Sequence, residues 1–77
     1  MESDFSEANL TEADLTMTIL RMANLRGTIL QNANMERAEV ESADLTKANL
    51  RGCNVRGVNL RGATLESTIM PDGKPFS

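Results

Sequence analysis

The chain has 77 residues, which is enough for one domain near the lower size limit for burying its own core. It contains two Phe, no Trp and no Tyr, so its core must be built from many medium-sized side chains such as Leu and Ala. The net charge of −3 gives no general affinity for nucleic acid or for an anionic membrane surface.

Several residue patterns on which specific functions depend are absent from the sequence. There is no apolar run long enough to span a bilayer and no signal-peptide pattern, so a cytoplasmic location is the default expectation. The chain has no histidine, which removes the commonest general base and the commonest metal ligand. We therefore expect no catalytic activity, no cofactor, no metal site and no small-molecule substrate.

From the N-terminus to residue 70, every fifth residue is apolar and is preceded, two positions earlier, by a small residue. The residue between them is mostly polar, often Asn or Asp. The central apolar residues, expected to form the core, are Phe5, Leu10, Leu15, Leu20, Leu25, Leu30, Met35, Val40, Leu45, Leu50, Val55, Leu60, Leu65 and Met70.

A period of five residues fits neither an α-helix nor a continuous strand. On a helix, a step of five turns the side chain by about 140°, so the apolar residues would wind around every side. On an extended strand, each step of five moves the side chain to the opposite face. A one-sided core therefore requires the chain to turn once in every repeat, which predicts an all-β coil built from very short extended segments.

Residues at the expected corners support this coil. Gly27, Gly52, Gly57, Gly62 and Asn32 all lie two residues after a central apolar residue. Gly and Asn accept the positive φ that a type II turn needs at its third position. Other repeats place Glu, Met, Arg, Ser or Lys there, so we expect those corners to use a different turn.

The segments "ANLTEADLT", "ANLRG" and "ADLTKANLRG" resemble the pentapeptide-repeat family, and "TIMPDG" is similar to the end of the repeat tract in bacterial, especially cyanobacterial, members. The resemblance covers residues 1–70. It implies a right-handed quadrilateral parallel β-helix, a solenoid of about 3.5 coils with four pentapeptides per coil. Residues twenty apart would then stack. The charges alone leave this offset open, because pairs fifteen apart are also opposite in sign.

The first coil differs from the others in its surface. Its charged side chains are all acidic up to Arg21, which suits either a docking end for a basic partner or a solubilising terminus. Met17, Ile19 and Met22 place apolar side chains where other repeats carry polar ones, and we expect them to cluster around one corner. Exposed apolar clusters mark contact surfaces, so these three residues are predicted to contact a partner.

Two features in the second half of the chain have structural explanations. Arg51, Arg56 and Arg61 are five apart, which places them on different sides of one coil, and no aromatic residue lies among them for base stacking. We interpret them as solvated corners and expect no nucleic-acid partner. Cys53 occupies an inward small position and is predicted to be a buried thiol that acts as a small apolar residue.

Residues 71–77 break the repeat and are predicted to form an end cap. Pro71 and Pro75 cannot donate to a strand ladder, and Asp72-Gly73 favours a turn. We expect this tail to fold across the C-terminal end, with Phe76 covering the last central residues. The N-terminal end has no comparable segment, so we expect it to pair with another copy or to continue a preceding chain.

The sequence thus favours a non-catalytic structural or protein-interaction solenoid. Its partner would be another protein or a second copy, bound as a homodimer or end to end. The alternative is a nucleic-acid mimic that inhibits a topoisomerase such as gyrase, as the quinolone-resistance branch of the resembled family implies. That branch has Phe at many central positions and a strongly negative surface, whereas this chain has only Phe5 there and interleaves its acids with Arg.

Overall fold

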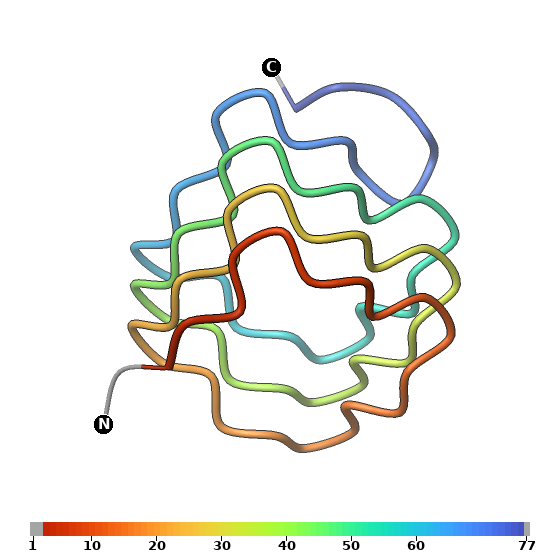
Figure 1. The fold of residues 1–77 in the computed structure, drawn as a ribbon. Helices are drawn as coiled ribbons and strands as arrows, with labels where there is room; N and C mark the ends of the chain where they lie inside the picture. Colours follow the sequence, from red (N-terminus) through yellow and green to blue (C-terminus); the bar gives the residue numbers. More distant parts are fainter. Residues whose placement is uncertain (1–2, 77) are drawn as a thin grey trace.

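The chain winds into a stack of coils with the same path in each turn (Figure 1). The computed structural model describes residues 3–76. Parallel bridges join residues twenty apart along the whole stack, so equivalent positions in neighbouring coils are separated by four repeats. The bridged pairs are Asp4–Asn24, Asn9–Ile29, Asp14–Asn34, Ile19–Glu39, Asn24–Asp44, Ile29–Asn49, Asn34–Asn54, Glu39–Asn59, Asp44–Thr64 and Asn49–Ile69.

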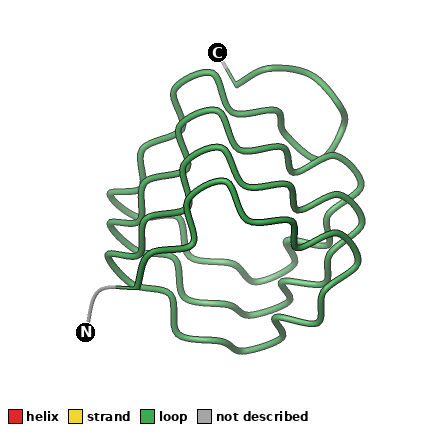
Figure 2. Ribbon diagram, in the orientation of Figure 1, coloured by secondary structure: helices red, strands yellow, loops and turns green. Residues whose placement is uncertain are grey.

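Each side of a coil is too short to form a conventional strand. Within residues 3–76 the structure contains isolated bridges and two-residue turns but no helix and no longer strand (Figure 2). Hydrogen bonds nevertheless connect the coils throughout. The amide of Leu25 donates to the carbonyl of Asp44 at 2.8 Å, and the amide of Asp44 donates to the carbonyl of Ala23 at 3.0 Å. The solenoid is therefore a parallel β-structure divided by corners.

The corners all use one turn, so the expectation of a different turn at non-glycine corners is wrong. Each turn is closed by a hydrogen bond from the amide of its fourth residue to the carbonyl of its first, as the amide of Ala38 donates to the carbonyl of Met35 at 2.9 Å. The third turn residue has a positive φ whether it is Gly52 (73°), Glu12 (61°) or Met22 (61°). Wherever another coil follows, the amide of this third residue also donates to that coil, so the corners follow one path. These bonds offset the roughly 1–2 kcal/mol cost of the left-handed conformation.

The Asn and Asp residues that precede the central residues stabilise these turns. The Oδ1 atom of Asn34, for example, accepts a hydrogen bond from the amide of Glu36 at 3.1 Å. Such Asx turns satisfy an amide that the ladder leaves free. The same bond is made by Asp4, Asn9, Asp14, Asn24, Asn34, Asp44, Asn49, Asn54, Asn59 and Asp72.

The central residues fill the interior, and the middle of the stack is the most completely buried. The central residues from Leu25 to Leu50 and the small residues beside them are buried, including Thr28, whose hydroxyl donates to the carbonyl of Leu25 at 2.8 Å. Leu20 is also buried, but the other central residues of the first and last coils are only half-buried, because a neighbouring coil covers them on one side. They are Phe5, Leu10, Leu15, Val55, Leu60, Leu65 and Met70.

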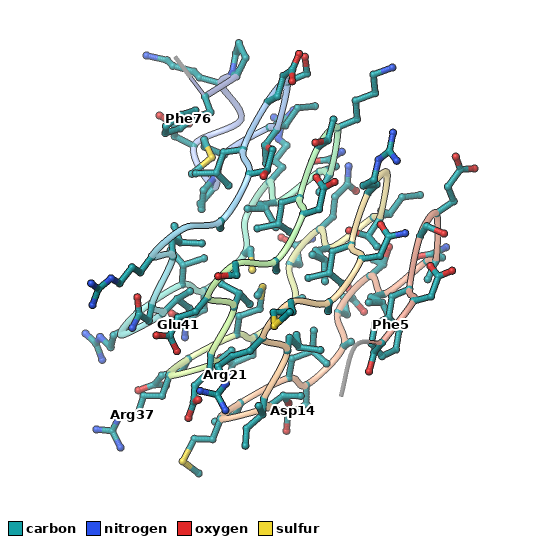
Figure 3. The ribbon with its side chains drawn as sticks, turned by 90° about the vertical axis from the view of Figure 1, so that its left-hand side faces the viewer. Phe5, Asp14, Arg21, Arg37, Glu41 and Phe76 are labelled. Atoms are coloured by element: carbon teal, nitrogen blue, oxygen red, sulfur yellow. The ribbon has the colours of Figure 1, made fainter. Side chains whose placement is uncertain are left out.

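The tail reverses direction and pairs with one side of the last coil. The amide of Met70 donates to the carbonyl of Lys74 and the amide of Phe76 to that of Thr68, both at 2.8 Å. The side chain of Phe76 is 49% exposed, and Leu65 stays half-buried, so the cover is partial. Phe5 and Phe76 lie toward opposite ends of the stack (Figure 3). The assignment of residues 71–77 as a cap stays a prediction, and Ser77 lies outside the described residues.

Cys53 is buried at an inward small position, with 5% of its surface exposed. It stands twenty residues after Ala33, in the same column. Burial raises the pKa of its thiol from 9.0 to about 11, because the thiolate would lose its hydration. A nucleophilic role would require the opposite shift.

The core register predicts a large difference between an inward and an outward carboxylate. Leu45 is fully buried, so Leu45→Asp places a charge without a partner in the core and should cost about 4 kcal/mol or more, which is enough to unfold a small domain. Asn49→Asp adds the same charge on an outward side, where an Asp oxygen can still accept from the Arg51 amide. Thermal unfolding followed by circular dichroism measures both. Equal melting temperatures would contradict the register.

The burial of Cys53 predicts slow chemical labelling in the native state. A rise in pKa from 9.0 to about 11 lowers the thiolate fraction at pH 8 by about 100-fold, before any steric protection is counted. A maleimide or disulfide reagent should therefore react at least about 100-fold faster in denaturant than in native buffer. Similar rates in the two conditions would show that the small column does not face inward.

Candidate functional site

The surface aspartates serve the turns. The Thr46 hydroxyl donates to Asp44 at 2.5 Å, and this bond, followed by that from the Thr46 amide, holds the pKa of Asp44 below its usual value. The Thr16 hydroxyl and amide lower the pKa of Asp14 in the same way. Hydrogen bonds to the charged form favour ionisation, so these groups are poor general acids at neutral pH.

Ion pairs run diagonally between coils. Arg21 lies 3.9 Å from Glu39, and Arg26 lies 3.8 Å from Asp44. Both pairs are eighteen residues apart, whereas Arg21 and Glu41, which are twenty apart, share a corner of neighbouring coils without coming within salt-bridge distance (Figure 3). The pairs are well exposed, so each contributes about 0–1 kcal/mol and chiefly keeps the surface electrically mixed.

Other kinds of site find little support in residues 3–76. This part of the chain holds no group of three or more Cys, Asp or Glu placed to bind a metal ion. It also holds no helix of the length and hydropathy needed to cross a membrane. Arg51, Arg56 and Arg61 follow three successive sides of the coil and do not form one basic stripe.

One side of the first coil carries a band of exposed apolar side chains. Met17, Ile19 and Met22 are 63%, 66% and 56% exposed. They do not surround a single corner as expected, because Met17 and Met22 occupy the turns at the two ends of the side on which Ile19 lies. We call these three residues the apolar side. The backbone ladder holds the two turns in place: the amides of Met17 and Met22 donate to the backbone carbonyls of Glu36 and Glu41, both at 2.9 Å.

A shallow groove adjoins the apolar side and combines apolar and charged groups. Its volume is about 300 Å³, and its lining residues are Ile19, Arg21, Met22, Glu41 and Ser42. Met17 is not part of it. A second groove of about 330 Å³ at another corner is almost entirely polar, and it is lined by Ser6, Glu7, Asn24, Arg26, Thr46 and Lys47. The first groove is the better candidate for recognition, since it offers apolar surface with charges at its rim.

Solved structures of pentapeptide repeat proteins resemble this fold. A pentapeptide repeat protein from the thylakoid lumen of Arabidopsis thaliana matches with a TM-score of 0.86 and 34% identity, over 88% of this chain and 47% of that one. HetL, a pentapeptide repeat protein involved in heterocyst differentiation regulation in the cyanobacterium Nostoc sp. strain PCC 7120, matches with a TM-score of 0.70 and 38% identity, over 99% of this chain and 34% of that one. This chain therefore spans less than half the length of either protein. None of the curated proteins matches it.

A family model provides the remaining comparison. The model for pentapeptide repeats matches residues 3–39, 18–57 and 43–71, which together cover almost the whole repeat tract. The chain belongs to the pentapeptide repeat family and has its right-handed β-helical fold.

Proposed function

We propose that this chain is a non-catalytic interaction module that binds a protein partner through the apolar side of its first coil. The observation that supports the proposal is the exposure of Met17, Ile19 and Met22, which are the three most exposed large hydrophobic side chains of the described residues and lie on one side of one coil. Within the proposal, the solenoid is a quadrilateral of about three and a half coils with four pentapeptides each. Its role is to hold surface residues rigidly at fixed spacings.

The residue types of the apolar side favour recognition over structural support. Met17 and Met22 have φ values of 58° and 61°, as the other repeat corners do, but they place long apolar side chains where those corners carry Gly or a polar residue. Ile19 replaces an Asn or Asp that would accept a hydrogen bond from the turn amide. The three residues thus keep apolar surface in water that the turns do not require, which suits a contact with a partner.

The partner should present an apolar side chain flanked by charges. Arg21 and Glu41 line the groove beside Ile19 and Met22, so the rim offers both signs of charge. HetL, one of the similar proteins, is involved in regulation, which agrees with an interaction role without identifying a partner. The cytoplasmic location expected from the sequence stays a prediction, since the other similar protein comes from the thylakoid lumen.

The topoisomerase-inhibitor alternative receives no specific support. A mimic of nucleic acid needs a continuous negative surface. Here Arg26 lies beside Asp44 and Arg21 beside Glu39, so acids and bases alternate across the coils. A gyrase supercoiling assay distinguishes the two functions, and the interaction proposal expects no inhibition.

Replacing the apolar side by Asn should abolish partner binding without loss of stability. Asn tolerates positive φ at positions 17 and 22, and at position 19 it can accept a hydrogen bond from the Arg21 amide, as Asn24 does from that of Arg26. We expect Met17→Asn/Ile19→Asn/Met22→Asn to melt no lower than the wild type. Proteins retained from cells of the source organism by the immobilised wild-type chain should fall by at least about tenfold, the effect of losing a small apolar hot spot.

A matched variant controls for the added Asn residues. Glu12→Asn/Lys47→Asn/Thr64→Asn changes two turn positions and one outward position elsewhere on the surface. It should retain the same proteins as the wild type, measured by quantitative mass spectrometry. Retention of the same proteins by the apolar-side variant would refute the assigned surface.

A further inference from the structure

The hydrogen bonds between coils have a direction. In each inner coil, the amides of the central residue and of the third turn residue donate toward the C-terminal end, as Leu25 does to Asp44 at 2.8 Å and Gly27 to Thr46 at 2.9 Å. The amide of the outward residue donates the other way, as Asp44 does to Ala23 at 3.0 Å. The two ends of such a stack must therefore present different sets of free groups.

The two edges of the described stack are complementary to each other. Within residues 3–76, carbonyls without a backbone partner crowd the N-terminal edge, at Asp4, Ser6, Asn9, Thr11, Asp14, Thr16, Ile19 and Arg21. Amides without one crowd the C-terminal edge, at Val55, Gly57, Leu60, Gly62, Leu65 and Ser67. The N-terminal edge is thus rich in acceptors and the C-terminal edge in donors. Neither edge can pair well with another of its own kind.

Charge and apolar surface follow the same polarity. Asp4, Glu7, Glu12 and Asp14 surround the first coil, which has no basic residue between residue 3 and Arg21. Arg51, Arg56 and Arg61 mark three corners of the last coil, against the single acid Glu66. Half-buried central residues, which contact the core on one side, lie at both edges.

We propose that the C-terminal edge is a docking surface for the N-terminal edge of a second copy of this chain, stacked head to tail in the register of the internal coils. Phe5 of one copy would lie over Val55 of the other, Leu10 over Leu60 and Leu15 over Leu65. This interaction is heterologous, so it continues from copy to copy. It uses the ends of the stack and not the apolar side, so it holds or fails independently of the proposed function.

The register also places charges favourably. Arg26 pairs with Asp44, eighteen residues ahead, at 3.8 Å. The same geometry across the interface brings Asp4 of one copy beside Arg56 of the other. Glu66 would meet Asp14, the one unfavourable pair among these positions. Head-to-head stacking, by contrast, would oppose two coils that carry only acidic charges from residue 3 to residue 20.

The tail occupies one of the four docking positions. Residues 18–20 of the incoming copy would lie over residues 68–70, where the tail already receives the amide of Met70 and donates to the carbonyl of Thr68. Docking of a full coil therefore requires the tail to leave. Gly73 holds the tail in place: its φ is 84°, and its amide donates to the carbonyl of Met70 at 2.8 Å.

Gly73→Pro should release the tail and promote association. Proline cannot adopt a φ near 84° and has no amide hydrogen, so the turn at residue 73 is lost while the coils remain. Because docking then no longer competes with the hydrogen bonds of the tail, the dissociation constant measured by sedimentation equilibrium should fall by about tenfold or more. Asp72→Asn, which keeps an acceptor for the Lys74 amide, should behave as the wild type.

Charge reversal tests the polarity of the contact. In the Gly73→Pro background, Asp4→Asn/Glu7→Lys/Glu12→Lys/Asp14→Asn makes both ends basic and keeps the turn acceptors, because Asn24 and Asn34 accept the same bonds. Arg56→Glu/Arg61→Glu makes both ends acidic. Each variant alone should remain monomeric, and an equimolar mixture should associate. Glu and Lys already occupy equivalent positions at Glu36, Glu41 and Lys47, so the variants should fold, which melting curves verify.

Three results would overturn the proposal: monomeric Gly73→Pro at all concentrations, association unaffected by charge reversal, or a mixture that stays monomeric. Adding the apolar-side substitutions to Gly73→Pro should leave association unchanged, and its loss would assign the contact to that side instead.

If Gly73→Pro melts below the wild type, the two charge variants are mixed in the wild-type background. Association there supports the interface, and its absence at high concentration contradicts it.

Discussion

The constraint on which the whole structure depends is the backbone ladder between coils, which a corner interrupts in every repeat. No side of a coil is long enough to be stable alone, so each depends on the coils above and below it. The ladder fixes the path of every turn and thereby forces residues such as Glu12, Arg37 and Lys47 into positive φ. The conformational preference of the single residue is overridden because each corner repeats the hydrogen bonds of its neighbours.

This constraint divides the residues by task. The central and small positions fill the interior, and the Asn and Asp side chains satisfy turn amides that the ladder leaves free. The remaining positions project into solvent with fixed spacing. Departures from the pattern, such as Ile19 among the outward residues, are therefore not required by the repeat, and the proposed contact surface is built on them. The same ladder gives the stack a direction, because its two edges differ in the groups that they leave unpaired.

The sequence was most informative where one residue type suits one environment. Burial of Leu25, Leu45 and Ala43 follows from the period of five alone, because that period leaves a coil as the only way to keep them together. The turn at Glu12 could not be predicted from Glu itself, since its conformation is imposed by neighbouring coils. The diagonal pairing of Arg21 with Glu39 depends on how the side chains lean across the ladder, which spacing does not reveal. The hydrogen bonds from turn amides to Asn and Asp side chains could have been predicted, because these residues recur two positions before the amides that they accept from.

Coupling across individual hydrogen bonds tests the central claim most directly. In protein labelled with ¹⁵N and ¹³C, through-bond nuclear magnetic resonance couplings should connect the amide of Leu25 to the carbonyl of Asp44, and that of Leu30 to the carbonyl of Asn49. These are the bonds of a ladder in which neighbouring coils are offset by four repeats. Couplings to carbonyls five residues earlier or later, which would indicate three or five repeats per coil, would contradict the account.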